Sequence, residues 1–214
     1  MNNITFDFNL FLKESKETLL NPKSYFSTMP VSGGITEPLI KAVIYGTVAG
    51  IIYALWIILG FGFAGGGMFG GNSVIMILFR SIIGAAIGLF IGAVILLIIS
   101  SICKGNTDFE ANIRVTSSLM VIIPISAFLS FFMGINMYLG MVVSLIVFLY
   151  SIWLLYHGLV ESLKGKTETA RIVCYVMIAL IVLSLLLSLS AKSKFEREFN
   201  YKYKGTKETL KDLK

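Results

Sequence analysis

The sequence has few of the residues from which catalytic and metal sites are built. Its 214 residues include one histidine, two cysteines and 14% charged residues, whereas soluble domains contain about 25% charged residues. Cys103 and Cys174 form no C-x-x-C pattern, so nothing indicates a metal site or a redox pair. The single histidine, His157, leaves no Ser-His-Asp arrangement to propose. We therefore expect no enzymatic activity, no cofactor and no bound metal.

Apolar sequence is what the chain has in abundance. Hydrophobic residues make up 56% of it, and the mean hydropathy is +0.84, which excludes an ordinary soluble domain. The formal charge is +6, but lysine and arginine lie almost wholly outside the apolar runs, as membrane-flanking residues do. We therefore expect a lipid bilayer around the chain and no nucleic-acid binding.

Five apolar runs are long enough to cross a bilayer core of roughly 30 Å. They cover about 39–59, 75–102, 115–133, 138–159 and 172–191, and the third contains Pro124. We predict an all-α, polytopic membrane helix bundle with five transmembrane helices over 39–191. A polar segment, 1–38, precedes it and a basic tail, 192–214, follows it.

The N-terminal segment contains a short amphipathic pattern over about 9–20. It is expected to end before Asn21-Pro22, because proline disfavours the helical conformation in the preceding residue. Such helices most often lie on the membrane surface, and a helix that binds a partner protein is the alternative.

Small residues recur every fourth position on the first two predicted spans. Close backbone approach over such residues is what brings helices together in lipid. We therefore predict that the first two spans form a tightly packed antiparallel hairpin, with these stripes facing each other: Ala42, Gly46, Gly50 and Ala54 on the first span, and Gly84, Gly88 and Gly92 on the second.

No ionisable residue lies near the centre of a predicted span, although such residues are the usual functional candidates in membranes. His157 and Glu161 are four residues apart, so they share a helix face and are predicted to pair at the interface rather than hold a metal. The glycine-rich connection 60–71 lacks the lysine and Ser/Thr of a phosphate-binding loop. It is predicted to be an interfacial turn.

Basic residues in the loops predict the orientation. After the first span, the internal loops and segment ends carry five basic residues on the N-terminal side and one, Arg80, on the other. We therefore expect a cytoplasmic N-terminus, which places the basic tail on the opposite side. The five are Lys104, Arg114, Lys164, Lys166 and Arg171.

Four passages occur in a characteristic order: NPKSYF at 21–26, Glu37-Pro38-Leu39, FEANIRV at 109–115 and YSIWLLYHGLVESLKGKTETA at 150–170. Together they resemble the Yip domain, or Ypt/Rab-interacting protein, family over about 19–191. The resemblance implies five spans, a cytoplasmic N-terminus and no catalytic site. The candidate partner-binding residues in and around these passages are Pro22, Tyr25, Phe26, Arg114, His157 and Glu161.

Eukaryotic members of that family are implicated in vesicle traffic and bind prenylated Rab GTPases through their cytoplasmic face. The resemblance therefore implies a small GTPase partner and a Golgi or ER membrane for a eukaryotic chain. The short N-terminal segment and the long basic tail depart from that pattern, so a prokaryotic cell-membrane protein with another partner is an equal alternative. A homo-oligomer is also compatible with the sequence.

A transporter or channel component is the alternative function. Pro124 in the third span and the polar turn at Asn136 favour it. The absence of central charges opposes it, and five spans do not divide into the inverted repeats common in transporters.

Overall fold

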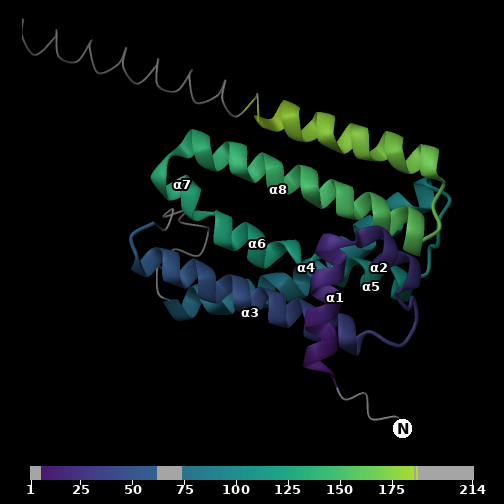
Figure 1. Ribbon diagram of the computed structural model, residues 1–214, viewed down its shortest axis with the longest axis horizontal. Helices are drawn as coiled ribbons and strands as arrows, with labels where there is room; N and C mark the ends of the chain where they lie inside the picture. The colour runs from purple at the N-terminus through teal and green to yellow at the C-terminus, as the bar shows by residue number, and fades with distance from the viewer. Residues whose placement is uncertain (1–5, 62–73, 186, 188–214) are drawn as a thin grey trace, which may run out of the picture. The chain divides into compact units, whose positions relative to one another are not determined.

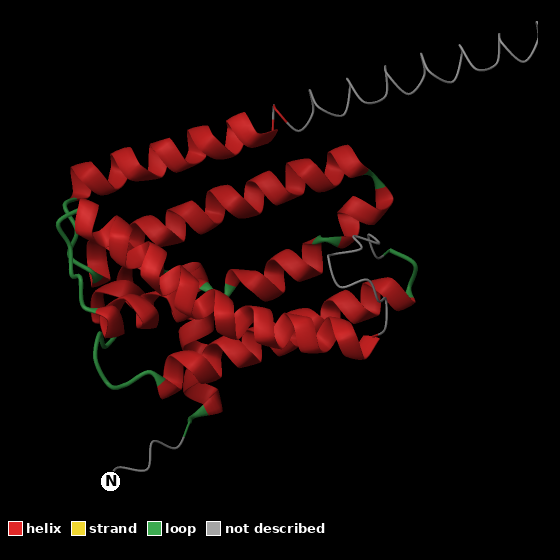
Figure 2. Cartoon of the chain, turned by 180° about the vertical axis from the view of Figure 1, so that it is seen from behind, coloured by secondary structure: helices red, strands yellow, loops and turns green. Residues whose placement is uncertain are grey.

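The computed structural model describes residues 6–61, 74–185 and 187, and the regular structure in this part is helical throughout (Figures 1 and 2). The glycine-rich connection from residue 62 and the basic tail 192–214 lie outside the described residues. The described helices are α1 (Phe8–Leu20), α2 (Pro22–Thr28), α3 (Thr36–Ile58), α4 (Val74–Ile102), α5 (Phe109–Leu119), α6 (Ile122–Leu129), α7 (Phe131–Ile135), α8 (Met137–His157), the π-helix η1 (Gly158–Ser162) and a helix over Thr167–Leu185.

Five helical stretches are long and apolar enough to cross a membrane, which confirms the predicted all-α architecture. They are α3, α4, α5–α7 together, α8 with η1, and Thr167–Leu185. The predicted amphipathic helix is also present as α1. The Asp7 carboxylate caps it by accepting the N–H groups of Asn9 and Leu10 at 2.8 and 3.1 Å, and it ends before Pro22 as expected.

The chain divides into two compact units, residues 1–174 and 175–214. The helix Thr167–Leu185 crosses this boundary. The groups described below all belong to the first unit.

Within the first unit, α3 packs most extensively against α4. The small-residue face of α3 is buried, and its backbone touches α4 directly: a Cβ added at Gly46 would lie 2.6 Å from the Ala85 Cβ and 2.8 Å from the Ser81 carbonyl oxygen. A Cβ at Gly50 would lie 3.0 Å from the Ser81 Cβ. Glycine is therefore required at Gly46 for the observed helix separation.

The predicted pairing of the two small-residue stripes is wrong on the α4 side. A Cβ added at Gly84 or Gly88 would have no atom within 4 Å, and one at Gly92 would meet Thr116 of α5, not α3. The α4 face against α3 instead includes Ser81 and Ala85. Ser81 and Ala85 have the same four-residue spacing as the glycines, but their stripe is displaced from the glycine stripe by one position along the helix. They are also small enough to allow close approach, so spacing alone could not choose between the two faces.

The helix of the third predicted span is interrupted close to Pro124. Pro124 has no N–H to donate to Met120, and the helix is interrupted between Leu119 and Ile122. A second break separates α6 from α7. Near it, the Trp56 indole donates to the Ala127 and Phe128 carbonyl oxygens at 3.1 and 3.2 Å. The Ala127 carbonyl oxygen also accepts the Ser130 N–H at 3.3 Å and the Ser130 hydroxyl at 2.7 Å. Several protein donors therefore surround the break, as a low-dielectric environment requires.

Candidate functional site

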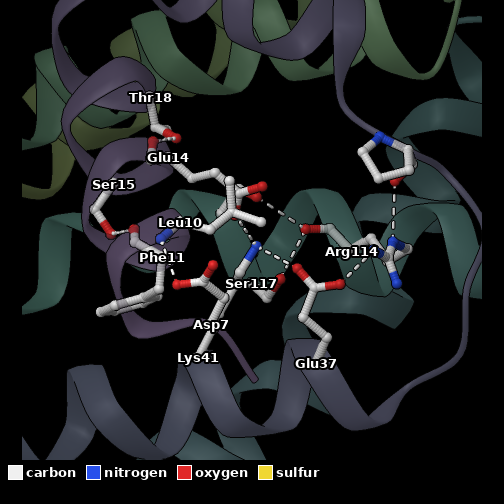
Figure 3. A network of polar contacts seen from close by, with 12 residues as sticks. Asp7, Leu10, Phe11, Glu14, Ser15, Thr18, Glu37, Lys41, Arg114 and Ser117 are labelled. Carbon is white, nitrogen blue, oxygen red and sulfur yellow. Dashed lines mark hydrogen bonds and ion pairs between the residues drawn. The ribbon is translucent and has the colours of Figure 1, made fainter. Parts of the chain in front are cut away.

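Four charged side chains from α1, α3 and α5 meet at one end of the first unit and are called here the charge cluster: Glu14, Glu37, Lys41 and Arg114 (Figure 3). The Lys41 Nζ lies 2.7 Å from a carboxylate oxygen of Glu14 and 2.7 Å from one of Glu37. The Arg114 Nη2 lies 2.6 Å from the other Glu37 oxygen. The Lys41 and Arg114 side chains are only 8% and 6% exposed. Two bases and two acids therefore balance each other in a buried setting.

Arg114 also holds the loop between α2 and α3. Its Nε donates to the Pro30 carbonyl oxygen at 2.9 Å, and its Nη1 donates to that of Gly34 at 3.1 Å. One turn earlier on α5, the Glu110 carboxylate accepts the N–H groups of Gly33 and Gly34. Both glycines have positive φ, at 131° and 89°, which side chains disfavour. Glu110 and Arg114 of α5 therefore hold this loop in place, and the two glycines allow its backbone conformation.

Apolar contacts reinforce the attachment of α1. Phe11 is 4% exposed and packs on Tyr45 of α3, with ring centroids 5.2 Å apart. The Tyr45 hydroxyl lies 2.8 Å from the Ser15 hydroxyl. The Tyr150 hydroxyl of α8 donates to the Leu19 carbonyl oxygen. One face of α1 is thus joined to two spanning helices.

The α2 aromatic pair is buried as well. Tyr25 places its hydroxyl 2.9 Å from the Ser118 hydroxyl of α5, and burial raises the pKa of Tyr25 above its ordinary value, so the phenol stays neutral. Phe26 is 1% exposed and approaches Gly158, where an added Cβ would lie 2.8 Å from Val115 and 3.7 Å from the Phe26 ring. Gly158 therefore leaves room for α2 to pack against the end of α8.

The two loops at this end are joined to each other. The Asn106 N–H donates to the Leu163 carbonyl oxygen at 2.6 Å, and the Lys166 N–H donates to that of Cys103 at 2.8 Å. Because α2 also packs on η1, the loops and the N-terminal helices form one surface. We call the exposed side of α1, α2 and these loops the N-terminal face.

A groove of about 520 Å³ separates α2 from the end of α8 and is called here the α2–α8 groove. The His157 ring lies edgewise to the Trp153 ring, with centroids 5.1 Å apart. The Nδ1 atom of His157 is buried and has no hydrogen-bond partner among the described residues. The residues that line the groove are Leu20, Asn21, Pro22, Lys23, Ser24, Ser27, Trp153 and His157.

The predicted pairing of His157 with Glu161 is not observed among the described ion pairs and hydrogen bonds. The chain changes from α to π geometry between them: the Leu163 N–H donates to the Gly158 carbonyl oxygen, five residues back, at 3.1 Å. The Glu161 carboxylate still acts on the imidazole electrostatically, without a hydrogen bond or an ion pair between the two side chains.

The structure assigns most of the candidate partner-binding residues an internal position. Tyr25, Phe26 and Arg114 are 6%, 1% and 6% exposed, so these side chains are not placed to touch a partner directly. Instead, they hold the N-terminal face together. Pro22 and His157 line the groove. Glu161 lies in η1, partly exposed.

Sequence reasoning missed Glu14 and Glu37 as partners of the basic residues, and Glu110 as the acceptor for the Gly33 and Gly34 N–H groups. Two signals were available. Lys41 follows Glu37 by four residues on a helix, the spacing of an ion pair. A lysine just inside an apolar run also needs a buried counter-charge. The contribution of Glu14 from a different helix had no local signal.

A family model described as the Yip1 domain matches residues 16–190. The chain belongs to the Yip1 domain family. The match contains Glu37, Lys41, Arg114 and all the residues that line the α2–α8 groove, whereas Glu14 lies just before it. It also confirms the resemblance inferred from the four sequence passages. No curated protein matches the chain, and no solved structure matches it.

Proposed function

We propose that this Yip1-family membrane protein is non-enzymatic and binds a partner protein through its N-terminal face. The observation that carries the proposal is the attachment of both N-terminal helices to the spanning helices, α1 by the charge cluster and α2 by the buried Tyr25 and Phe26. A pre-ordered surface loses less conformational entropy on binding than a free N-terminal arm would. A general role in membrane traffic fits the family, and a small GTPase is the partner that the family resemblance suggests for a eukaryotic chain.

The outer side of α1 supplies the binding surface. Leu12 and Leu20 are 50% and 65% exposed on the outer side of α1, and Phe8, 55% exposed, lies next to Phe11, with ring centroids 5.9 Å apart. Exposed apolar side chains on an ordered helix are suited to a groove or helix on a partner. Contact of the same face with the bilayer surface is the competing outcome.

Site-specific photo-crosslinking tests this proposal. A photoreactive residue at Leu12 should give protein adducts in native membranes, whereas one at Ile95, a 52% exposed position in the apolar helix α4, should give lipid adducts. Lys41→Met should reduce the Leu12 protein adducts and leave the Ile95 adducts unchanged. If Leu12 gives lipid adducts alone, α1 rests on the bilayer and the partner-binding proposal is wrong.

We also propose that the N-terminal face is cytoplasmic, as the loop charges predict. A cysteine at the exposed Lys166 should react with an impermeant maleimide only in opened cells, and one at the exposed Ile135, the last residue of α7, should react in intact cells. Cys103 and Cys174 are replaced in both variants, although burial already raises the pKa of the Cys103 thiol and slows its labelling. The reverse pattern would overturn the orientation.

Transport is the second candidate function, because broken helices such as the third span occur in transporters. The Trp56 contacts with the Ala127 and Phe128 carbonyl groups oppose it, since they fill one break with protein. Solute uptake or ion conduction by the protein reconstituted in liposomes would favour this candidate over partner binding.

A further inference from the structure

The α2–α8 groove has the composition of a site for an amphipathic anion. Lys23 lies on its α2 side, and none of the eight described residues that line it is acidic. The ion pairs among the described residues use Lys13, Lys41 and Arg114, not Lys23. Lys23 therefore gives the groove a positive charge that no lining carboxylate neutralises.

The groove also offers hydrogen-bonding groups that the fold does not consume. His157 has its buried Nδ1 atom without a partner among the described residues. Ser24 is exposed and lines the groove, whereas the Ser27 hydroxyl already donates to the Ser24 carbonyl oxygen at 2.8 Å. Because the Nδ1 atom of His157 is buried, a ligand would reach it only after the imidazole ring turns, so Lys23 and Ser24 are the polar residues that a ligand meets directly.

The apolar part of the groove indicates where the anion comes from. Trp153 is 44% exposed and lies one turn before the end of α8, and Leu20 is 65% exposed. A tryptophan near the end of a spanning helix is typical of the level of lipid head groups. A soluble anion would use the cationic side alone, whereas a phospholipid also places acyl carbons next to its phosphate.

From these observations we propose that the α2–α8 groove binds the head group of an anionic phospholipid. Lys23 contacts the phosphate, with Ser24 and His157 as further polar partners. Trp153 and Leu20 contact the glycerol and the first acyl carbons. The groove shares Leu20 with the outer side of α1. The two proposals are therefore tested at different residues, partner binding at Leu12 and lipid binding at Lys23 and Trp153, so either can fail without the other.

Trp153 provides a direct test, because the chain has two tryptophans and a Trp56→Phe variant leaves it as the only one. The protein is placed in phosphatidylcholine nanodiscs that contain a minor fraction of one brominated lipid. This lipid is either phosphatidylglycerol or phosphatidylcholine, in each case with brominated acyl chains. Brominated phosphatidylglycerol should quench Trp153 more strongly at equal fraction. Lys23→Gln should weaken the preference about fivefold, the effect of one basic residue near an anionic surface. Lys16→Gln, an exposed lysine outside the groove, is the matched control and should retain it.

Equal quenching by the two brominated lipids, or a preference that survives Lys23→Gln, would overturn the proposal. A response of Trp153 fluorescence to inorganic phosphate in pure phosphatidylcholine nanodiscs, with no preference for brominated phosphatidylglycerol, would assign the groove to a soluble anion and also overturn it. Native mass spectrometry of the parent with both tryptophans provides a second measurement, in case Trp56→Phe disturbs packing. Phosphatidylglycerol should stay bound to the parent and to Lys16→Gln and be lost from Lys23→Gln.

Discussion

Two contact regions of this protein hold helices together by opposite means. At the N-terminal end, α1, α3 and α5 are joined by charged side chains that are largely buried, around Lys41 and Arg114. Further along, α3 and α4 are held together by close contact over small residues, with Gly46 against the α4 backbone. The first contact depends on charge and the second on volume. Substitutions that preserve one property should therefore spare one contact and damage the other.

The difference follows from the surroundings of each contact. Apolar side chains gain little by leaving lipid for another helix, so close van der Waals contact over small residues is the available attraction in the apolar part of α3 and α4. Near the helix ends, charged side chains can be buried because each lies next to a side chain of opposite charge. A buried pair is costly to break because the remaining charge has no partner.

The largest expected effect comes from removing the central cation. Lys41→Met leaves the Glu14 carboxylate without the ammonium group that lies 2.7 Å from it, and removal of one partner of a buried ion pair costs about 3–5 kcal/mol. Unfolding in mixed micelles measures this change in free energy. Lys16→Met, at an exposed position on α1, should be nearly neutral, and a Lys41→Met protein as stable as the parent would contradict the role of the cluster.

The next effect concerns the α3–α4 contact. Gly46→Leu must move the α4 backbone near Ser81 and Ala85, and overpacking of this kind costs about 1–3 kcal/mol. Gly88→Leu adds the same side chain where a Cβ meets no atom within 4 Å, so it should change stability little. Thermal unfolding of the two variants in one detergent decides the matter. A larger loss from Gly88→Leu would restore the stripe pairing that the structure corrects.

A smaller loss is expected at the loop between α2 and α3. Glu110→Gln keeps an acceptor for the Gly33 and Gly34 N–H groups but removes the charge, and hydrogen bonds to a charged acceptor are stronger than those to a neutral one. Limited proteolysis should cleave residues 30–35 faster in this variant than in Glu17→Gln, a control on the exposed side of α1. Equal cleavage would show that the carboxylate does not order the loop.

The smallest effect is a pH dependence from Tyr25. Burial raises the pKa of this phenol in the folded state, so the folded chain retains the proton more strongly than the unfolded chain does. The contribution of the neutral phenol to stability is complete below the pKa of tyrosine in the unfolded chain, about 10. It is lost as the pH rises from that value through the raised pKa of the folded state. Tyr25→Phe should reduce the decline of the melting temperature above pH 10. An identical decline in the variant would assign it to other groups.

Much of this fold could be read from periodicity and length, because spanning helices are set by bilayer thickness. The helix 9–20 and its end before Pro22 were predicted for the same local reasons that the structure displays. The facing side of α4 was not predictable, since Ala85 and Gly84 are both compatible with close packing. The partner of Arg114 was not predictable either, because Glu37 is distant in sequence. The change to π geometry after His157 had no local signal in the sequence.

Hydrogen exchange of the backbone in lipid nanodiscs tests the central claim most directly, namely that the charge cluster holds α1 to α3 and the glycine contact holds α3 to α4. We predict protected amides in α1 and α2 of the parent. Lys41→Met should lose the protection of α1 first while α4 keeps its own, and Gly46→Leu should lose protection in α3 and α4 first. Unprotected α1 and α2 in the parent, or the same loss pattern in both variants, would contradict the account.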